Sequence, residues 1–198
     1  MGMLSDDQLM AMGFAAVGSN VQISEKASFY GVNKIYLGSN IRIDDFCVIS
    51  AGSGGIRIGN HVHIAVSACL IGSGLIELSD FVGISSRAII YSSNDDYSGA
   101  ALTGPTIPAM FTNVTHLPVF VGKHVVVGSG SVVLPGVSIG EGAAVGALTL
   151  VNRSCESFAV YGGNPMRRIK DRKRDLLRLE EQLLQFESDD KRLRGGDL

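Results

Sequence analysis

The 198-residue sequence lacks an excess of positive charge, a long apolar run and paired cysteines. Its formal net charge is −2 at pH 7, which argues against a protein that binds nucleic acid through a basic field. No segment approaches the roughly 18 consecutive apolar residues of a membrane span. Acidic residues stand near the start, where a secretory signal needs basic ones. We therefore expect a cytoplasmic protein with no membrane span and no nucleic-acid partner.

Motifs for disulfides, metals and covalent catalysis are also missing. Cys47, Cys69 and Cys155 are far apart and form no Cys-x-x-Cys pair, so free thiols in a reducing compartment are expected. No Gly-x-Ser-x-Gly or Cys-His nucleophile motif is present. His61 and His63 form a His-x-His pair, but no cysteine or carboxylate cluster completes a tetrahedral site by spacing. No bound metal is predicted.

The sequence does contain a period of six residues. Neither the alternation of a strand nor the 3.6-residue repeat of a helix explains a stride of six. The stride is unbroken over one stretch, at Val121, Val127, Val133, Ile139, Val145 and Val151. Similar hexads begin earlier, at Val17, Ile23, Leu37, Ile43, Ile49, Ile58, Ile64, Leu70, Leu78, Ile84 and Ile90.

Three hexads per coil describe a triangular solenoid. Each side is then a short parallel strand, each corner is a tight turn, and the aliphatic residue of each hexad stacks inward on its equivalent one coil away. Small residues at the second and fifth positions suit narrow corners and a thin interior. An ordinary β-sandwich would instead show period-two alternation in strands of five or six residues. The pattern predicts an all-β solenoid.

Two segments interrupt this pattern. The insertion over residues 92–118 has no hexads and holds three of the five prolines, and such insertions are usually functional. After a basic segment, apolar residues on a helical stripe predict a helix over about 172–187, packed on the solenoid or on a neighbouring subunit. We expect a cap over 1–16, in which residues 5–12 form a short amphipathic segment that closes the first coil. A solenoid over 17–163 and a C-terminal segment over 164–198, frayed at its last five residues, should follow.

The hexads and the stretch "SVVLPGVSIGEGAAVGALTLVNRSCESFAVYGGNPMRRIK" resemble the hexapeptide-repeat acyltransferases over residues 17–170. This resemblance implies a left-handed parallel β-helix, a homotrimer with active sites between subunits, and acetyl-CoA as co-substrate. The segments "RIDDFCVIS", "IGNHVHIA" and "YSSNDDYSGAALTGPTIP" are similar to the sugar acetyltransferase branch, which includes galactoside, maltose and polysaccharide-pathway acetyltransferases.

The resemblance also implies a binding site for coenzyme A at the C-terminal end. Ser129, Gly146 and Ala147 would offer backbone groups along the pantetheine arm. Basic side chains would bind the nucleotide phosphates, which arginine and lysine suit chemically. These are Arg153, Arg167, Arg168 and Lys170.

The identity of the general base stays open at this stage. The galactoside and maltose branch has a histidine in the loop where this sequence has Asp95, which is a departure from the pattern. His63 is the other candidate, because Asp44 and Asp45 are expected one coil before it and would orient its imidazole. His116 is a weaker candidate and His124 the weakest. Asp44, Asp45, Asn94 and His116 are expected to bind the sugar or to orient the base.

Acyl transfer from a thioester needs a base, an oxyanion donor and a leaving thiol, but no covalent enzyme intermediate. A neutral sugar amine needs less help from a base than a hydroxyl, so the missing loop histidine favours an amino sugar. The predicted function is acetyl transfer from acetyl-CoA to an amino or hydroxyl group of a sugar or nucleotide-linked sugar, in the biosynthesis of lipopolysaccharide O-antigen or capsule. The alternatives are a non-catalytic solenoid and a carbonic-anhydrase-like metalloenzyme.

Overall fold

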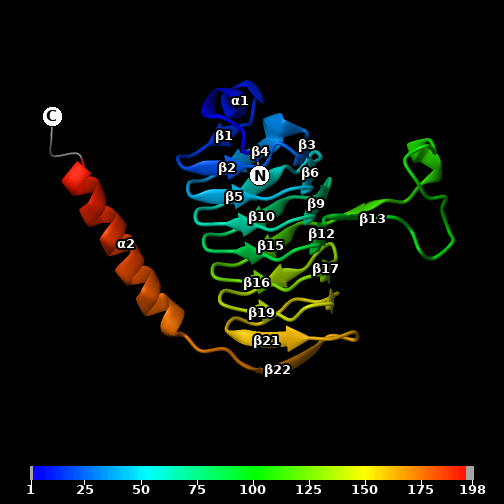
Figure 1. Cartoon of the computed structure of the whole chain (residues 1–198). Coiled ribbons are helices and arrows are strands. Elements are labelled where there is room, and N and C mark those ends of the chain that lie inside the picture. The colour runs from blue at the N-terminus through cyan, green and yellow to red at the C-terminus, as the bar shows by residue number, and fades with distance from the viewer. Residues whose placement is uncertain (1, 195–198) are drawn as a thin grey trace.

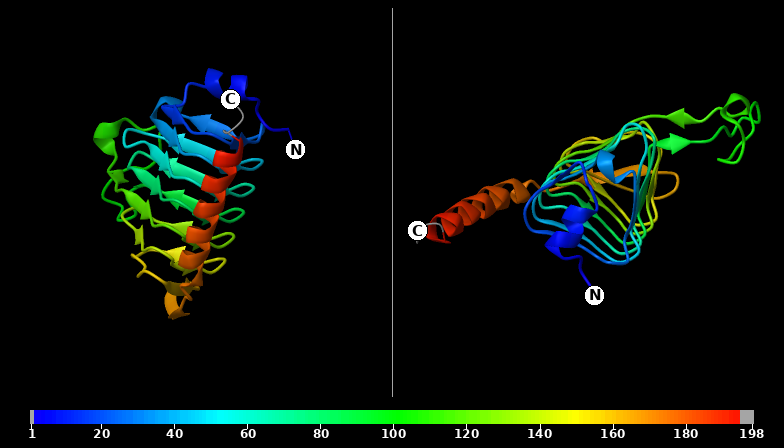
Figure 2. Two further views of the ribbon diagram at one scale, coloured as in Figure 1. Left: turned by 90° about the vertical axis from the view of Figure 1, so that its left-hand side faces the viewer. Right: turned by 90° about the horizontal axis from the view of Figure 1, so that it is seen from above.

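The computed structural model describes residues 2–194, with side chains to residue 190. The chain winds into a triangular column of about seven coils with the form of a left-handed β-helix (Figure 1). The view from above shows the triangular cross-section, each side of which is a sheet of mainly parallel strands (Figure 2). One long segment, residues 92–118, and the C-terminal helix lie outside the column. The prediction of an all-β solenoid with an insertion and a C-terminal helix is confirmed.

Each side of the column is one sheet, and the sheets are named here in the order in which the chain meets them. The first sheet contains β1 (Ala16–Val17), β4 (Ile35–Leu37), β7 (Ile56–Ile58), β10 (Ile76–Leu78), β15 (Val119–Val121) and β18 (Ser138–Ile139). The second contains β2 (Val21–Ile23), β5 (Ile41–Ile43), β8 (His63–Ile64), β11 (Gly83–Ile84), β16 (Val126–Val127), β19 (Ala144–Val145), β21 (Ala159–Gly162) and β22 (Arg167–Asp171). The third contains β3 (Ser28–Tyr30), β6 (Val48–Ala51), β9 (Cys69–Gly72), β12 (Ile89–Tyr91), β17 (Val132–Val133) and β20 (Leu150–Val151).

The period of six arises because every side of a coil sends one aliphatic residue inward in register with the coils on either side. In the second sheet, Ile43 pairs with Ile64, and Ile64 pairs with Ile84. All three side chains are buried, and the column continues through Val127 and Val145. Each fully buried aliphatic side chain contributes on the order of 1.5–3 kcal/mol. The stacked columns therefore form a continuous core along the axis.

The corner between the first and second sheets carries a ladder of residues with left-handed backbone. Asn20, Asn40, His61, Phe81 and His124 occupy equivalent positions, each with φ between 54° and 60°. Asparagine and histidine are enriched among residues with this conformation, whereas a bulky residue such as phenylalanine rarely adopts it. Here the rings stack, with centroids 4.6 Å apart for His61 and Phe81 and 5.0 Å apart for Phe81 and His124. Stacking between coils therefore supports the unusual backbone.

Both ends of the column are covered. Helix α1 (Asp6–Ala11) begins at a capping box formed by Ser5 and Gln8, and it buries Leu9 against the first coil. At the other end, β22 pairs antiparallel with β21 and ends the second sheet. A short 3-10 helix, η1 (Val32–Lys34), lies in the corner between the third and first sheets.

The insertion forms a projecting arm, defined here as residues 92–118. It leaves the column between β12 of the third sheet and β15 of the first sheet, at the corner opposite the second sheet (Figures 1 and 2). Strands β13 (Ser93–Asn94) and β14 (Thr115–His116) pair antiparallel as its stalk, and η2 (Ala109–Phe111) lies farther out. Tyr97, Met110 and Phe111 leave much of their apolar surface exposed.

Helix α2 (Asp175–Arg194) runs along the corner between the first and second sheets (Figure 2). It begins three residues later than predicted, because the Arg172 guanidinium donates hydrogen bonds to the carbonyls of His124, Gly142 and Ala143 and holds the chain against the corner. The helix ends at Arg194, seven residues later than predicted, and so includes the first of the five residues expected to fray. The other four, residues 195–198, lie outside the described residues. Neither helix within residues 2–194 has the length and apolar character that a membrane crossing requires.

Candidate active site

His63 begins β8 on the outer face of the second sheet, and its side chain is half exposed. The imidazole Nε2 lies 2.8 Å from Oδ2 of Asp44, which belongs to the preceding coil. The other carboxylate oxygen, Oδ1, accepts a hydrogen bond of 2.8 Å from Nε of Arg42. The structure thus places Asp44 between a cation and the predicted base.

The Asp44 carboxylate is kept ionised by these two partners. Burial alone would raise its pKa, but hydrogen bonds from Arg42 and His63 and their positive charges outweigh burial and lower the pKa below the ordinary value. Asp45 lies elsewhere: its carboxylate binds Ser24 and forms an ion pair of 3.0 Å with Lys26. Of the two aspartates, only Asp44 contacts His63.

A shallow groove of about 400 Å³ begins at His63 and crosses the second sheet toward its corner with the third. Its lining is formed by Ala65, Gly83, Ser85, Ser86, Val126 and Ser129. The predicted base and Ser129, a predicted cofactor-binding residue, therefore share one surface. Sequence reasoning missed Ser85 and Ser86, although extending the hexad register from His63 places them one coil away.

Gly146 and Ala147, also predicted to bind the cofactor, lie one coil farther along than Ser129. Gly146 is engaged within the protein, because its N–H donates to the carbonyl of Tyr161 at 2.8 Å and its carbonyl accepts from Ser131 Oγ at 2.9 Å. Ala147, at the same corner, is exposed. The backbone of Ala147 therefore remains better placed than that of Gly146 to meet a ligand.

The basic residues divide between two places. Arg167, Arg168 and Lys170 lie exposed on β22, at the end of the sheet that carries the groove. Arg168 pairs with Asp171 and with Glu156. Arg153 lies at the corner between the third and first sheets, and its guanidinium donates to the carbonyl of Met166 at 3.0 Å. One chain does not bring all four cations together.

The remaining candidates lie on the arm. His116 Nδ1 is 2.7 Å from Ser93 Oγ across the stalk, Asn94 is half-buried and Asp95 is exposed. Because the arm leaves at the corner opposite the second sheet, a single chain does not bring Asp95 to His63. Within residues 2–194, no group of three histidine, cysteine, aspartate or glutamate residues could hold a metal ion.

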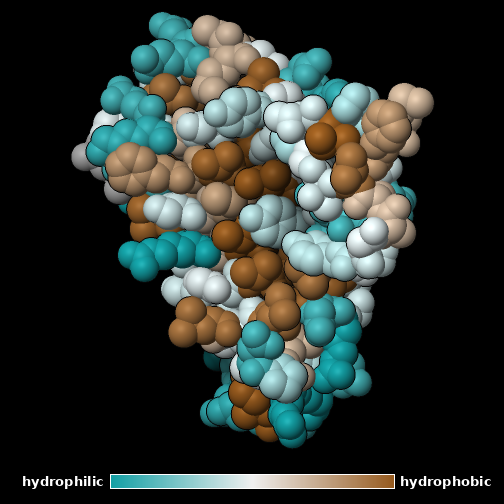
Figure 3. Space-filling model, turned by 90° about the vertical axis from the view of Figure 1, so that its right-hand side faces the viewer, coloured by the Kyte–Doolittle hydropathy of each residue, from teal (hydrophilic) through white to brown (hydrophobic). Residues whose placement is uncertain are grey.

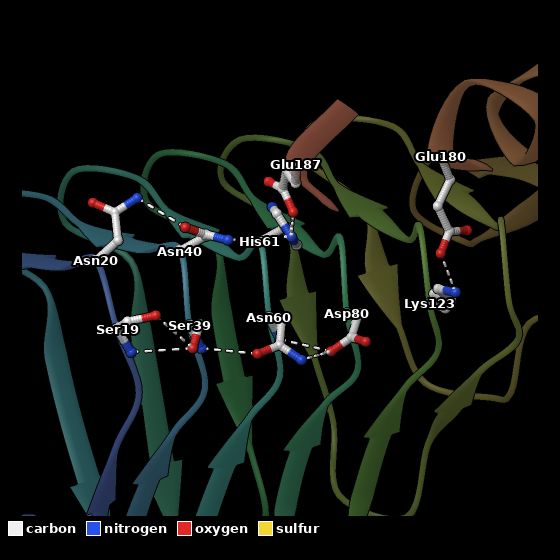
Figure 4. Close-up of polar contacts among 10 residues, drawn as sticks. All are labelled: Ser19, Asn20, Ser39, Asn40, Asn60, His61, Asp80, Lys123, Glu180 and Glu187. Carbon is white, nitrogen blue, oxygen red and sulfur yellow. Dashed lines mark hydrogen bonds and ion pairs between the residues drawn. The ribbon is translucent and has the colours of Figure 1, made fainter. Parts of the chain in front are cut away.

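His61 and His124 contact helix α2, and Figure 4 shows His61 beside Glu187 of that helix. His124 is buried, and its Nε2 lies 2.7 Å from Glu180, which also pairs with Lys123. His61 Nε2 lies 3.6 Å from Glu187. Figure 4 also shows a polar ladder in which Asn60 donates to Asp80 and Ser39 donates to Asn60. These contacts hold the corner and the helix together, away from the groove.

Comparison with known proteins shows the family of this chain. No family model matches the chain. The chain is 52% identical over 180 residues to the dTDP-4-amino-4,6-dideoxy-D-glucose acyltransferase of Escherichia coli, covering 91% of this chain and 94% of that one. This chain belongs to that acyltransferase family.

Solved structures of the acyltransferase family agree. AntD, an N-acyltransferase from Bacillus cereus in complex with dTDP and 3-hydroxybutyryl-CoA, is 45% identical over 94% of this chain and 98% of its own, with a TM-score of 0.90. AntD has also been solved with dTDP-4-amino-4,6-dideoxyglucose and coenzyme A, at a TM-score of 0.89. Galactoside acetyltransferase, at 18% identity and a TM-score of 0.54, shares the fold.

The sequence-based prediction of a coenzyme-A-dependent acyltransferase for nucleotide-linked sugars is therefore confirmed at the level of the family. The resemblance to hexapeptide-repeat acetyltransferases is confirmed as well. The individual roles of His63, Asp95 and the cofactor-binding residues stay predictions.

Proposed function

We propose that this acyltransferase moves an acyl group from acyl-CoA to the amino group of dTDP-4-amino-4,6-dideoxyglucose. The observation that carries the proposal is the groove that joins the His63–Asp44 pair to Ser85 and Ser129, in a chain so similar to proteins named for this sugar. N-acyl transfer also agrees with the expectation that a chain without the loop histidine acts on an amine. We place the reaction in the cytoplasm, within surface polysaccharide assembly.

We further propose a homotrimer, which the third sheet supports. Its outward residues form an apolar column, which Figure 3 displays as a brown band down this face. Their register is continuous through Val48, Cys69, Ile89, Val132 and Leu150. The first sheet instead alternates Tyr36, Arg57, Glu77, Phe120 and Ser138. An apolar face of this extent is the one that subunits bury.

A cyclic trimer built on the third sheet would complete the active site. In a ring of identical subunits, one edge of each interface meets the opposite edge of the next subunit. One edge of the third sheet carries the groove with Ser85 and Ser129, and the other edge carries the arm with Asp95. The ring therefore brings the arm of one subunit to the groove of its neighbour. The separation of His63 and Asp95 within one chain is what such a shared site requires.

The solved variants of AntD support particular residues in this site. They carry substitutions at a serine and at an aspartate ten positions later. Ser85 lies in the groove of this chain, and Asp95 follows it at the same separation. Ser86 and Asp96 share this separation, but the Asp96 carboxylate accepts hydrogen bonds from Ser98 and from backbone N–H groups within the arm. We assign Asp95 from the neighbouring subunit as the general base and Ser85 as a hydroxyl donor beside the reacting carbonyl.

The proposed reaction needs one proton acceptor and one leaving group. The sugar amine attacks the thioester carbonyl carbon, a C–N bond forms, and Asp95 accepts a proton from the nitrogen. Ser85 stabilises the tetrahedral oxyanion by hydrogen bonding. The intermediate then expels coenzyme A by breaking the C–S bond, and the thiolate takes up the proton. His63 is held by Asp44, which in turn is held by Arg42. His63 would bind the sugar nucleotide at the end of the groove where β8 lies.

The coenzyme A itself would run from the groove toward β22. Ser129 and Ala147 would contact the pantetheine arm, and Arg167 and Lys170 would meet its phosphates. Arg153 lies at the corner between the third and first sheets, away from the groove of its own chain. We therefore assign it to the crevice between neighbouring subunits, where it would contact coenzyme A bound to the next subunit.

The test is an assay of thiol release from acetyl-CoA and 3-hydroxybutyryl-CoA with dTDP-4-amino-4,6-dideoxyglucose as acceptor. dTDP-6-deoxyglucose, with a hydroxyl in place of the amine, is the matched control. We expect turnover with the amine alone. Asp95→Asn should lose on the order of 10²- to 10⁴-fold in kcat, the range for a general base. His63→Gln should mainly raise KM for the nucleotide sugar.

Two outcomes would count against the proposal. Equal turnover of the hydroxyl sugar would reject amine specificity. Full activity of Asp95→Asn together with a collapse of kcat in His63→Gln would transfer the role of base to His63.

A further inference from the structure

Gly83 interrupts the outward row of side chains on the second sheet. It lies in register between His63 of β8 and Val126 of β16. On the coils farther along, the equivalent positions carry Ala144 and Val160. Gly83 alone in this row has no side chain, and it faces the groove.

The backbone does not require glycine at this position. Among the glycines that the structure describes, only Gly83 and Gly146 combine a φ outside the left-handed region with no contact closer than 3.4 Å to an added Cβ. At Gly83, such a Cβ would meet only Val126 Cγ2, at the ordinary distance of 3.8 Å. At Gly128, by contrast, it would lie 2.5 Å from the backbone nitrogen of Ala147.

Glycine within a strand is also unfavourable, because it loses more conformational freedom than other residues and contributes no packing. Such a glycine often marks the close approach of a ligand. The missing side chain at Gly83 leaves space in the wall of the groove at a cost to strand stability, which indicates that a ligand occupies this space.

The surroundings identify the occupant. On one side of Gly83, Arg42, Asp44 and His63 form a polar, charged cluster suited to a sugar nucleotide. On the other side, the row becomes apolar through Val126 and reaches the basic strand β22, which suits a pantetheine arm and its phosphates. Gly83 lies at the junction, where the thioester must meet the amine.

We propose that Gly83 determines acyl-group specificity, because its missing side chain leaves the space that receives the acyl chain of the donor. This inference rests on the proposed function. The chemical class of ligand is a short acyl thioester longer than acetyl, such as a hydroxyacyl group, whose hydroxyl would find Ser85 or Ser86 within the same groove.

The test compares Gly83→Ala and Gly83→Val with wild type, using acetyl-CoA, butyryl-CoA and 3-hydroxybutyryl-CoA as donors. One methylene in a close-fitting pocket changes kcat/KM by about 10- to 200-fold. We expect Gly83→Ala to lose at least about tenfold with the four-carbon donors and about twofold or less with acetyl-CoA. Gly83→Val should lose activity with all three. Affinity for free coenzyme A, measured by calorimetry, should stay unchanged in Gly83→Ala.

Ser138→Val is the matched control, because Ser138 faces outward on a strand of the first sheet, away from the groove. It should leave all donors unchanged. Thermal unfolding should place Gly83→Ala at or above the wild-type midpoint. For Gly83→Ala, an equal loss with all three donors, or no loss with any, would overturn the proposal that Gly83 leaves space for the acyl chain. Absence of acyl transfer in wild type, with coenzyme A still bound, would instead reject the proposed function.

Discussion

Asp44 accepts hydrogen bonds from two cationic or polar partners, and these determine the pH range in which its charge stabilises the fold. Its pKa in the folded protein lies below the ordinary value of 3.8, since Arg42 and His63 outweigh the effect of burial. A carboxylate with a lowered folded pKa contributes stability above its unfolded pKa and loses it as the pH falls through the folded pKa.

The variant Asp44→Asn should therefore be less stable than wild type at pH 7, by roughly 1–3 kcal/mol, because it loses charged hydrogen bonds to Arg42 and His63. The difference should shrink as the pH falls toward 3. Urea unfolding at pH 7 and pH 3 measures it. Asp95→Asn, at an exposed aspartate, is the control and should match wild type at both values. A deficit of equal size at both pH values would show that the charge of Asp44 is not its source.

Cys47 should be nearly inert in the folded protein. Its side chain is buried, and burial raises the pKa of the thiol to about 11. Since the thiolate is the reactive form, alkylation at pH 8 should be slow for Cys47 and for Cys155, whose pKa burial also raises to about 11. Half-buried Cys69 lies in the apolar column of the third sheet, so it should react first in separated subunits and be protected in the proposed trimer. Peptide mapping after a short pulse of iodoacetamide checks this order, and urea-unfolded protein is the control. Prior labelling of Cys47 would contradict it.

At this scale, the sequence predicts contacts that depend only on coil length. The pairing of Asp44 with His63 could be predicted because one coil separates them and the register is regular. The contacts of Asp45 could not be predicted in this way, because the corner turns its side chain away from His63 and toward Ser24 and Lys26. The sequence does not distinguish Gly83 from the other glycines, because its proposed role depends on the space that an added Cβ would fill.

Among the elements, helix α2 docks through polar residues. Glu180 forms ion pairs with Lys123 and His124, and Glu187 lies near His61. The apolar side chains of Leu179 and Phe186 remain exposed. Burial alone would raise the pKa of Glu180, but hydrogen bonds from Lys123 and His124 outweigh it and lower the pKa. The helix should therefore stay docked above the ordinary pKa of a glutamate and loosen in acid.

Glu180→Gln should release α2 from the corner at neutral pH, because the amide keeps the shape but loses both charged interactions. Hydrogen–deuterium exchange over residues 175–190 should speed up by about 10-fold or more, corresponding to a loss of roughly 1–3 kcal/mol in local stability. Glu181→Gln, on an exposed position of the same turn, should exchange as wild type does. Equal protection in both variants would mean that other contacts hold the helix.

The repeat predicts the strands well, but it does not predict where the appended elements point. The helical stripe predicted α2 from residue 172, whereas Arg172 is used to anchor the chain and the helix starts at Asp175. The arm was predictable only as an interruption of the hexads over residues 92–118. Its antiparallel stalk and its direction depend on tertiary contacts, such as the one between Ser93 and His116, that no period encodes.

For the molecule as a whole, the thin solenoid explains why the proposed active site needs a second subunit. Each coil contributes one inward residue per side, so aliphatic side chains of the chain itself fill the interior. Ligands must bind on the outside, where one sheet offers only a shallow groove. In the proposed trimer, the arm of another subunit closes over that groove.

Ile89→Lys tests this dependence of activity on assembly. Ile89 faces outward in the apolar column of the third sheet, so a lysine there leaves the inner core intact but places a charge in the proposed interface. Size-exclusion chromatography with light scattering should give a trimer for wild type and monomers for the variant. Thiol release should fall by at least about 100-fold, with a largely unchanged circular dichroism spectrum.

Phe120→Lys supplies the matched control, because Phe120 also faces outward and is exposed, but on the first sheet. It should remain trimeric and active, since that sheet already carries charged residues and lies away from the proposed interface. A monomeric wild type with full activity would remove the need for a shared site. A trimeric Ile89→Lys variant would move the interface to another face. Loss of trimer and activity together would tie Asp95 of one subunit to the groove of the next, because no single chain brings the two into contact.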